Sequence, residues 1–342
     1  MQHPATVTRA GGRTGCRWTA VVVGTVLTLA GKPATAQQMP LLGVRPFNGQ
    51  ATALGKPNHV FHYYVEADRG WGGFDGSDRE AARIGEARAA QDRFPDRLIL
   101  VSYAGMPQSG ATLEDCAEGA YDARYRRYGR AMQAAGLGRI VLRVGWEWDG
   151  SANPMGIEGD SGRAALYRRC FRNIARNIRA GYGGSARNLL FDFNSTTGIA
   201  HRGGLPLLSS GYPGDDVVDI VSVEGFDNRP CAPATDAACR WGRVLRSLTM
   251  VRDFARARGK RMAIPEWAIW NTTGSADPYH IQGFDNPMHV RNLCAFARDP
   301  ANNVLYYVYF NGSRHSPWYD LTEPRNRRAA EAFATYCGSG PD

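Results

Sequence analysis

Several patterns that mark common protein classes are missing from this 342-residue sequence. It has no G-x-S-x-G turn, which excludes the usual nucleophile elbow of a serine hydrolase. It has no C-x-x-C pair and no histidine pair at zinc-ligand spacing, so we expect neither a metal nor another cofactor. Internal repeats and low-complexity stretches are also missing, which argues against a secreted structural or adhesion protein.

Basic residues, mostly arginine, outnumber acidic ones and give a formal net charge of +9. Four of them lie in the first 36 residues, which contain no acid, so the rest of the chain carries +5. The others are scattered along predicted helices, as at Arg124, Arg126, Arg127 and Arg130. This distribution is typical of solvated helix faces, and we expect no nucleic-acid partner. Weak affinity for an anionic polysaccharide is left open.

The first 36 residues have the pattern of a secretory signal peptide. Three arginines precede an apolar run over 18–30, and residues 34–36 (ATA) match an A-x-A cleavage site. The run is too short for an ordinary transmembrane helix, so we expect no membrane span after cleavage. Roughly 300 residues would remain, which is enough for one large domain. We therefore expect a secreted or periplasmic protein, and a monomer.

Cysteine usage agrees with export, because an even number of cysteines follows the expected cleavage site. The sequence alone leaves the connectivity of six cysteines open. Proximity along the chain favours Cys231–Cys239, which would close a small loop. The remaining pairs would then be Cys116–Cys170 and Cys294–Cys337.

Apolar segments of strand type alternate with helical segments from residue 59 onward. Strands are predicted at 59–65, 97–103, 139–147, 188–194, 217–226, 261–266 and 304–310. Helices are predicted at 78–92, 121–135, 166–178, 241–259 and 288–298. Seven to eight such units favour a closed barrel over an open doubly wound sheet, whose usual nucleotide-binding glycine loop is missing. We predict a single (β/α)8 TIM-barrel domain over 59–338, preceded by an irregular lead-in over 37–58.

Two of the predicted strands end in a glutamate flanked by tryptophan. Segment 139–150 (RIVLRVGWEWDG) contains Glu147, and segment 261–270 (RMAIPEWAIW) contains Glu266. In a (β/α)8 barrel, active sites lie at the carboxyl ends of the strands. Cleavage of a glycosidic bond needs one carboxylic acid that protonates the leaving oxygen and a second carboxylate at the anomeric carbon. Flat tryptophan rings suit the C–H faces of sugars.

A plainer interpretation treats both glutamates as strand-end carboxylates that pair with nearby arginines. We consider it weaker, because each combines a strand end with flanking tryptophan. Trp146 and Trp267 adjoin a glutamate and should point away from it in regular strand geometry, which also makes them candidates for core packing. The expected substrate contacts are Arg143, Trp146, Trp148, Asp149, Asn194, Asp227, Asn228, Trp267 and Trp270, with Asp192 as a further candidate. Loops 70–76 and 272–287 would border the groove.

The segment from Arg143 to Glu147, followed by WDG, resembles the acid/base strand of glycoside hydrolase family 26 and its relatives among the barrel glycosidases. Segment 212–221 (YPGDDVVDIV) resembles the stretch that leads into the sixth strand of that family. The strand of Glu266 then falls where the family has its nucleophile. The sequence departs from the family pattern at Trp146, where histidine is usual, and at Phe226, where tyrosine is common.

The resemblance implies that Glu147 is the general acid/base and Glu266 the nucleophile, with Arg143 supporting the site. The pKa of Glu147 should be raised by the nearby negative nucleophile. The implied activity is that of a secreted retaining endo-β-glycosidase acting on a polysaccharide or oligosaccharide, such as mannan, glucan, xylan or a bacterial exopolysaccharide. The alternative is a catalytically inactive carbohydrate-binding barrel, which would keep the tryptophans and lose the geometry of the glutamates.

Overall fold

The computed structural model describes residues 39–338, apart from 46–53, 66–69, 75–77, 152, 161, 184–187, 274–282 and 313–316. The chain divides into two units, Met1–Ala36 and Gln37–Asp342, and every described residue belongs to the second. The expected signal peptide and most of the loop 272–287 therefore lie outside the described residues. No helix in the described part is both long and apolar enough to cross a lipid bilayer.

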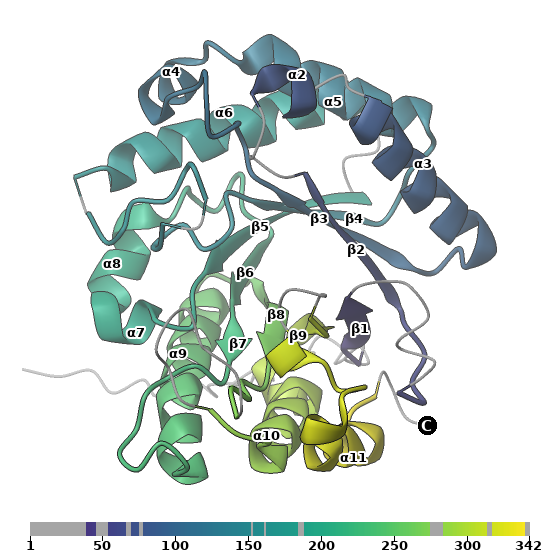
Figure 1. Cartoon of the computed structure of the whole chain (residues 1–342). Coiled ribbons are helices and arrows are strands. Elements are labelled where there is room, and N and C mark those ends of the chain that lie inside the picture. The colour runs from purple at the N-terminus through teal and green to yellow at the C-terminus, as the bar shows by residue number, and fades with distance from the viewer. Residues whose placement is uncertain are drawn as a thin grey trace, which may run out of the picture. The chain divides into compact units, whose positions relative to one another are not determined.

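Parallel strands form a ring, and helices surround it (Figure 1). The ring has eight strands in the described part of the chain: β1 (Leu41–Arg45), β2 (Val60–Val65), β3 (Leu98–Tyr103), β4 (Ile140–Val144), β5 (Leu189–Ser195), β6 (Ile220–Val223), β8 (Arg261–Ala268) and β9 (Val304–Phe310). Neighbours along the order β2-β3-β4-β5-β6-β8-β9-β1 pair in parallel. A short β7 (Gly225–Phe226) pairs with the end of β8. The predicted (β/α)8 barrel is therefore confirmed.

Strand β1 closes the ring between β9 and β2. It pairs with β9 along its whole length. Toward β2, the backbone N–H of His59 donates to the carbonyl of Leu42 at 2.9 Å. The side-chain amide of Asn58 donates to the carbonyl of Val44 at 2.9 Å and accepts from its N–H at 3.3 Å. The Asn58 side chain thus replaces part of the backbone hydrogen bonding between β1 and β2.

The irregular lead-in expected over 37–58 is wrong for the five residues of β1. Gly43 stands at the centre of that strand, and glycine weakens a strand pattern in sequence. A Cβ at Gly43 would lie 2.8 Å from Val60 Cβ and 3.0 Å from Val308 Cγ2. Glycine is therefore required by the close approach of β2 and β9, and the same requirement hides the strand from sequence analysis.

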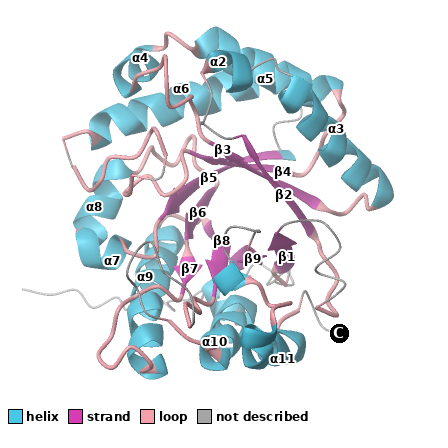
Figure 2. Ribbon diagram, viewed as in Figure 1, coloured by secondary structure: helices cyan, strands magenta, loops and turns pink. Residues whose placement is uncertain are grey.

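Helices cover the outside of the ring (Figure 2). They are α2 (Trp71–Phe74), α3 (Asp78–Arg93), α4 (Leu113–Glu118), α5 (Asp122–Ala134), α6 (Ala164–Tyr182), α7 (Ile199–Arg202), α8 (Gly204–Gly211), α9 (Ala237–Ala257), α10 (Pro287–Arg298) and α11 (Arg327–Tyr336), with 3-10 turns at Pro300–Asn302, Pro317–Tyr319 and Pro324–Asn326. The five predicted helices correspond to α3, α5, α6, α9 and α10. The segment 70–76, predicted as a loop, contains the short helix α2.

Strand side chains alternate between the barrel interior and the surrounding helices. The interior apolar cluster consists of Val60, Leu98, Leu100, Val141, Ile220, Ala263, Tyr306 and Val308. Further along the strands, the inward positions become polar yet remain buried: His62, Ser102, Arg143, Asp192, Asn194, Ser222 and Glu224. An apolar plug thus fills one part of the barrel, and a buried polar layer lies toward the carboxyl ends of the strands.

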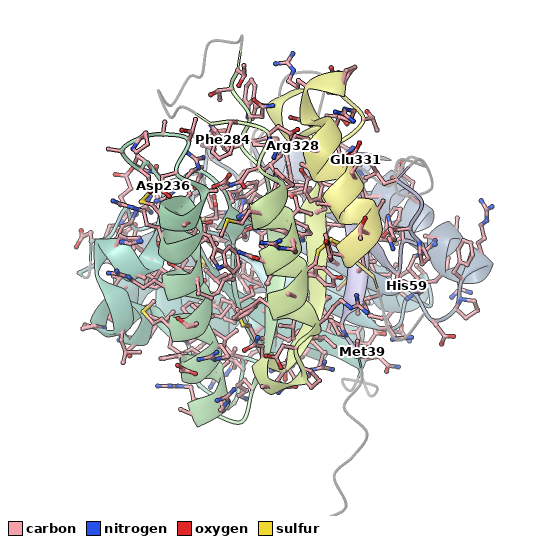
Figure 3. All side chains as sticks on the ribbon, turned by 90° about the horizontal axis from the view of Figure 1, so that it is seen from below. Met39, His59, Asp236, Phe284, Arg328 and Glu331 are labelled. Atoms are coloured by element: carbon pink, nitrogen blue, oxygen red, sulfur yellow. A yellow bond between two sulfur atoms is a disulfide. The ribbon has the colours of Figure 1, made fainter. Side chains whose placement is uncertain are left out.

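The two ends of the barrel are seen from the side in Figure 3. Asp236 and Phe284, in the segments that follow β7 and β8, lie near one end. Met39, two residues before the start of β1, lies toward the other. The carboxyl ends of the strands, where active sites of this fold lie, therefore face the end that carries Asp236 and Phe284.

Three disulfides tie the outer layer together, and all three were predicted. Cys116–Cys170 joins α4 to α6, and Cys294–Cys337 joins α10 to the residue after α11. Cys231–Cys239 closes a short loop onto the first turn of α9. Each bridge links segments that flank barrel strands, so the bridges restrict how far the helical layer can move around the ring.

Helices α5 and α6, which precede and follow β4, meet in backbone contact. A Cβ at Gly181 of α6 would lie 2.0 Å from the backbone oxygen of Arg126 in α5. A Cβ at Gly129 of α5 would lie 2.3 Å from the backbone oxygen of Ile178 in α6. Reciprocal glycines thus allow the two helices to pack more closely than side chains would permit.

We expect Gly181→Ala to lower the free energy of unfolding by about 1–3 kcal/mol, because its methyl group overlaps the α5 backbone. Gly242→Ala in α9 is the matched control, since a Cβ there meets nothing within 4 Å. It should stabilise the fold by roughly 0.5–1 kcal/mol through helix propensity. Urea unfolding of both variants checks the prediction. Equal effects would contradict the close packing of α5 and α6.

Candidate active site

Glu147 follows the end of β4 in a tight turn rather than in a continued strand. The strand ends at Val144, and both Gly145 and Glu147 have positive φ, +52° and +53°. A left-handed conformation is unfavourable for a residue with a Cβ, by about 1–2 kcal/mol. The turn overrides the strand alternation, and Trp146 does not point away from the site as regular geometry predicts. Its ring packs edge-on against Tyr64, with centroids 5.6 Å apart.

Asn194 holds the strained turn from the neighbouring strand β5. Its Oδ1 accepts the backbone N–H of Glu147 at 3.0 Å, and its Nδ2 donates to Ser222 Oγ at 2.9 Å. Asn194 is fully buried. It therefore positions Glu147, and its contact with substrate stays a prediction.

Glu266 points inward because β8 is irregular. Ile264 pairs with Tyr307 and Trp267 with Tyr309, so β8 has one more residue than β9 over this stretch. Ile264 and Trp267, three positions apart, both belong to the outer apolar layer. The bulge exchanges the faces of the strand, which turns Glu266 toward the interior. Pro265 lies inside it, and proline in a central strand is a signal of such a bulge.

The carboxylate of Glu266 is held by two donors. Tyr64 Oη donates to its Oε1 at 2.6 Å, and Arg143 Nη1 donates to the same oxygen at 2.5 Å. Burial raises the pKa of Tyr64 well above its ordinary value, and the Glu266 carboxylate raises it further. The phenol therefore keeps its proton and acts as a donor. The guanidinium of Arg45 stacks on the Tyr64 ring, 4.2 Å from its centroid.

Arg143 is fully buried and joins two glutamates. Besides Glu266, its Nη2 pairs with Glu224 Oε1 at 2.6 Å, and Glu224 is also fully buried. Burial alone would lower the pKa of Arg143, but the two carboxylates outweigh it and raise the pKa. Burial raises the pKa of Glu224 well above its ordinary value. Arg143 opposes this rise, whereas Glu266 and Glu147 add to it.

Glu147 has the properties of a general acid. Burial raises its pKa from 4.5 to about 7, and the Glu266 charge adds to the rise against the opposing Arg143. The expected increase is therefore found, although burial contributes more than the neighbouring carboxylate. Unlike Glu266, the Glu147 side chain accepts no hydrogen bond from the described residues. It remains partly exposed, and its raised pKa lets it hold a proton close to neutral pH.

A hydrogen-bonded layer supports these groups from below. Ser102 Oγ accepts from Arg143 Nη1 at 3.0 Å and lies 2.8 Å from His62 Nε2. Burial lowers the pKa of His62 well below its ordinary value, with Arg143 adding to the effect, so the ring is neutral. Asp192 accepts from Tyr306 Oη at 2.5 Å, and burial raises its pKa to about 6. Asp192 is fully buried, so it supports the barrel rather than contacting substrate.

Three predicted substrate contacts belong to the core. Trp148 is fully buried between Tyr167 and Phe193, and its Nε1 donates to Ser195 Oγ at 3.0 Å. Trp267 is likewise fully buried, against aromatic rings of β9 and α11. Asp149 is fully buried too, and its two carboxylate oxygens accept from the N–H and the hydroxyl of Thr196, which follows β5. The described structure gives all three a packing or hydrogen-bonding role in the core, and their contact with sugar stays a prediction.

Of the other predicted contacts, Asp227 and Trp270 are buried and Asn228 is partly exposed. Asp227 is buried and pairs with Arg240 Nε at 2.8 Å, so it anchors α9. Trp270 is 4% exposed and packs on Tyr319, which leaves little of its ring for a sugar. Asn228 stays partly exposed. The structure thus brings Arg143 and Trp146 to the two glutamates, and buries most of the other candidates in supporting contacts.

Sequence analysis did not find Tyr64 and Glu224. Each stands two residues beyond a buried polar residue that faces inward, Tyr64 after His62 and Glu224 after Ser222. Extending the period-two pattern along β2 and β6 would have found both. Tyr64 also donates its hydroxyl hydrogen to Glu266. The family resemblance would place the tyrosine near the nucleophile at the position of Phe226 instead. Phe226 instead packs against Phe310, with centroids 5.9 Å apart.

Comparisons with known proteins give similarity of fold. No protein-family model and no curated protein sequence matches the chain. An endo-β-1,4-mannanase of glycoside hydrolase family 26 from Cellulomonas fimi has a TM-score of 0.60 at 20% identity, covering 87% of this chain and 70% of its own. The catalytic domain of a family 26 endo-β-1,4-mannanase from Bacillus sp. JAMB-750 has a TM-score of 0.62 at 15% identity, covering 88% and 87%.

A fungal β-1,4-galactanase is also similar, with a TM-score of 0.54 at 13% identity and coverage of 79% of this chain and 83% of its own. The expected likeness to family 26 and its barrel relatives is therefore confirmed at the level of the fold. At these identities, the arrangement of the site itself has to carry any conclusion about activity.

We expect a glutamate carboxyl resonance with a titration midpoint near 7 in ¹³C NMR spectra of the protein. It should be missing from Glu147→Gln, which assigns it. In Glu266→Gln the midpoint should fall, because one negative charge is removed, while staying above 4.5 because burial persists. An unshifted midpoint near 4.5 in the parent protein would contradict the buried environment described for Glu147.

Proposed function

We propose that this protein is a retaining endo-β-glycosidase that hydrolyses a polysaccharide by double displacement with Glu147 and Glu266. The observation that carries the proposal is the contrast between the two carboxyl groups. Glu147 is partly exposed, accepts no hydrogen bond from the described residues and has its pKa raised to about 7. Glu266 is fixed by Tyr64 and Arg143. Environments that separate two carboxyl groups in this way are typical of acid and nucleophile pairs.

In the first step, Glu266 attacks the anomeric carbon of the bound sugar while Glu147 protonates the departing glycosidic oxygen. The bond from that carbon to the leaving oxygen breaks, and an ester bond to Glu266 forms. Tyr64 and Arg143 hold the attacking carboxylate in place. Arg143 keeps a carboxylate partner in Glu224 after Glu266 has lost its charge to the ester.

In the second step, Glu147 accepts a proton from water, which attacks the anomeric carbon and releases Glu266. The same residue can serve as acid and then as base because its pKa depends on the charge of Glu266. Once Glu266 is esterified, that contribution to the raised pKa disappears, and Glu147 gives up its proton more readily. The two-step sequence predicts net retention of the anomeric configuration.

The substrate belongs to the β-linked polymers on which this fold acts in other proteins. Two of the similar structures are named as endo-β-1,4-mannanases and another as a β-1,4-galactanase. Partly exposed rings of Trp146 and Phe226 are available near the glutamates for stacking against sugar. We therefore place β-mannan, β-glucan, xylan and bacterial exopolysaccharides in the first test panel.

Reducing-sugar release from that panel should fall by about a thousandfold in Glu147→Gln and in Glu266→Gln, with both variants still folded. An aryl glycoside with an activated leaving group distinguishes the roles. Glu147→Gln should still form the glycosyl-enzyme rapidly with it, because that leaving group needs no proton, whereas Glu266→Gln should not. Binding without cleavage, unchanged in both variants, would contradict the hydrolase and leave a carbohydrate-binding barrel.

The value of kcat/KM for a polysaccharide should decrease as the pH rises through about 7. The raised pKa keeps Glu147 protonated up to neutral pH, and deprotonation above it removes the acid needed for the first step. With the activated aryl glycoside this alkaline decrease should be much smaller. An alkaline decrease of equal size on both substrates would assign the titration to a group other than Glu147.

A further inference from the structure

Three arginines lie on the Glu147 side of the site, and the proposed reaction uses none of them. They are Arg202 at the end of α7, Arg229 after β7 and Arg243 in α9. The Arg202 charge acts on Glu147, and the charges of Glu147, Arg202 and Arg243 all act on Arg229. Positive charges grouped beside the acid create a positive potential that attracts anions.

Arg229 has no carboxylate partner among the described residues. It is partly buried, and its Nε donates to Asn228 Oδ1 at 3.0 Å. Burial lowers its pKa, and Arg202 lowers it further, against the opposing Glu147 and Asp149. Arg143, by contrast, is matched by two carboxylates. A partly buried guanidinium with only an amide oxygen for a partner retains donors for a ligand.

Two glycines make room for these guanidinium groups. A Cβ at Gly198 would lie 3.0 Å from Arg229 Nη1 and 3.5 Å from Arg202 Nε. A Cβ at Gly150, in the turn after Glu147, would lie 3.3 Å from Arg202 Nη1. Arg202 and Arg229 therefore converge over the β5–α7 connection, next to the turn that carries Glu147.

The nearest acid does not neutralise the group. Arg202 Nη1 is 3.6 Å from Asp149 Oδ2, and it also donates to the Asp149 backbone carbonyl at 3.0 Å. Both Asp149 oxygens already accept at 2.7 Å, from the N–H and hydroxyl of Thr196. One buried carboxylate thus acts on both Arg202 and Arg229, and Arg202 still has 43% of its side chain exposed.

We propose that Arg202 and Arg229 bind a carboxylate or sulfate ester carried by a sugar next to the scissile bond, so that the preferred substrate is an anionic polysaccharide. This rests on the proposed function for the identity of the scissile bond. Guanidinium groups bind planar or tetrahedral oxyanions through paired N–H donors, which suits both substituents. Arg243, which is exposed, adds positive potential that attracts such a chain.

The test uses β-1,4-mannan in three forms: unmodified, carboxymethylated and sulfated. Binding is measured by affinity electrophoresis in the Glu147→Gln background, so that no polymer is cut. We expect at least one charged form to bind about tenfold or more tightly than the neutral form, with the advantage decreasing as salt increases. The two charged forms distinguish a carboxylate from a sulfate site.

Adding Arg202→Gln and Arg229→Gln should abolish this advantage, so that charged and neutral mannan bind equally. Arg291→Gln is the matched control, because Arg291 is exposed on α10 and bonds to its neighbour Asn292. The double lysine variant, Arg202→Lys with Arg229→Lys, should keep part of the advantage, which separates loss of charge from loss of structure. Equal binding of charged and neutral mannan, or an advantage that survives the double glutamine variant, would overturn the proposal.

Cleavage by the parent protein separates this inference from the proposed function. If a polymer is cut but the charged forms gain nothing from Arg202 and Arg229, the hydrolase stands and the anion site is wrong. If charged mannan binds through these arginines but no polymer of the panel is cut, the anion site stands and the hydrolase is wrong.

Discussion

The ion pairs of Arg143 with Glu224 and Glu266 are the interaction on which the carboxyl end of the barrel depends. A carboxylate withdrawn from water is stable only if a positive charge or several donors compensate it. Here one buried guanidinium compensates two carboxylates, and burial raises the pKa of a third carboxyl group, Glu147, to about 7. In the proposed ester, where Glu266 has lost its charge, Arg143 would still have Glu224 as a buried partner.

Both glutamates depend on departures from regular strand geometry. Glu147 stands in a left-handed turn held by Asn194, and Glu266 is turned inward by a bulge at Pro265. Such conformations cost free energy and persist where the surrounding structure fixes them. The buried layer of hydrogen bonds beneath the site provides that fixation, since its members come from five different strands: His62, Ser102, Arg143, Asp192 and Ser222.

The sequence was sufficient to predict the barrel and to single out two strand-end glutamates, because buried parallel strands leave apolar runs that end in polar residues. It was insufficient where one residue type serves two purposes. Gly43 hid β1, since close packing against Val60 demands a residue that strands usually avoid. Trp148 and Trp267 were assigned to sugar binding, although tryptophan beside a polar site also fills space between barrel and helices.

The same ambiguity concealed Glu224. A polar residue that faces into a barrel looks like any other strand-end residue until its partners on neighbouring strands are known. Arg143 in β4 and Glu224 after β6 are separated by one strand of the ring, β5, and by 81 positions in sequence, so no local pattern links them. Pairings of this kind are set by topology and are visible only once the ring has closed.

The bulge in β8 also limits how the gene can change. Loops at the rim of a barrel tolerate gain or loss of residues, because their length is not coupled to the strand register. Between Ile264 and Trp267, however, the faces of the strand depend on the bulge itself. If the bulge were flattened without loss of a residue, regular alternation would turn the indole toward the interior and the carboxylate into the aromatic packing beneath α11. Loss of Pro265 together with the bulge would instead leave Ile264 and Trp267 two positions apart and keep Glu266 on the inner face. Lineages descended from this chain can therefore remodel the rim freely, whereas in this strand the bulge and its extra residue have to be gained or lost together.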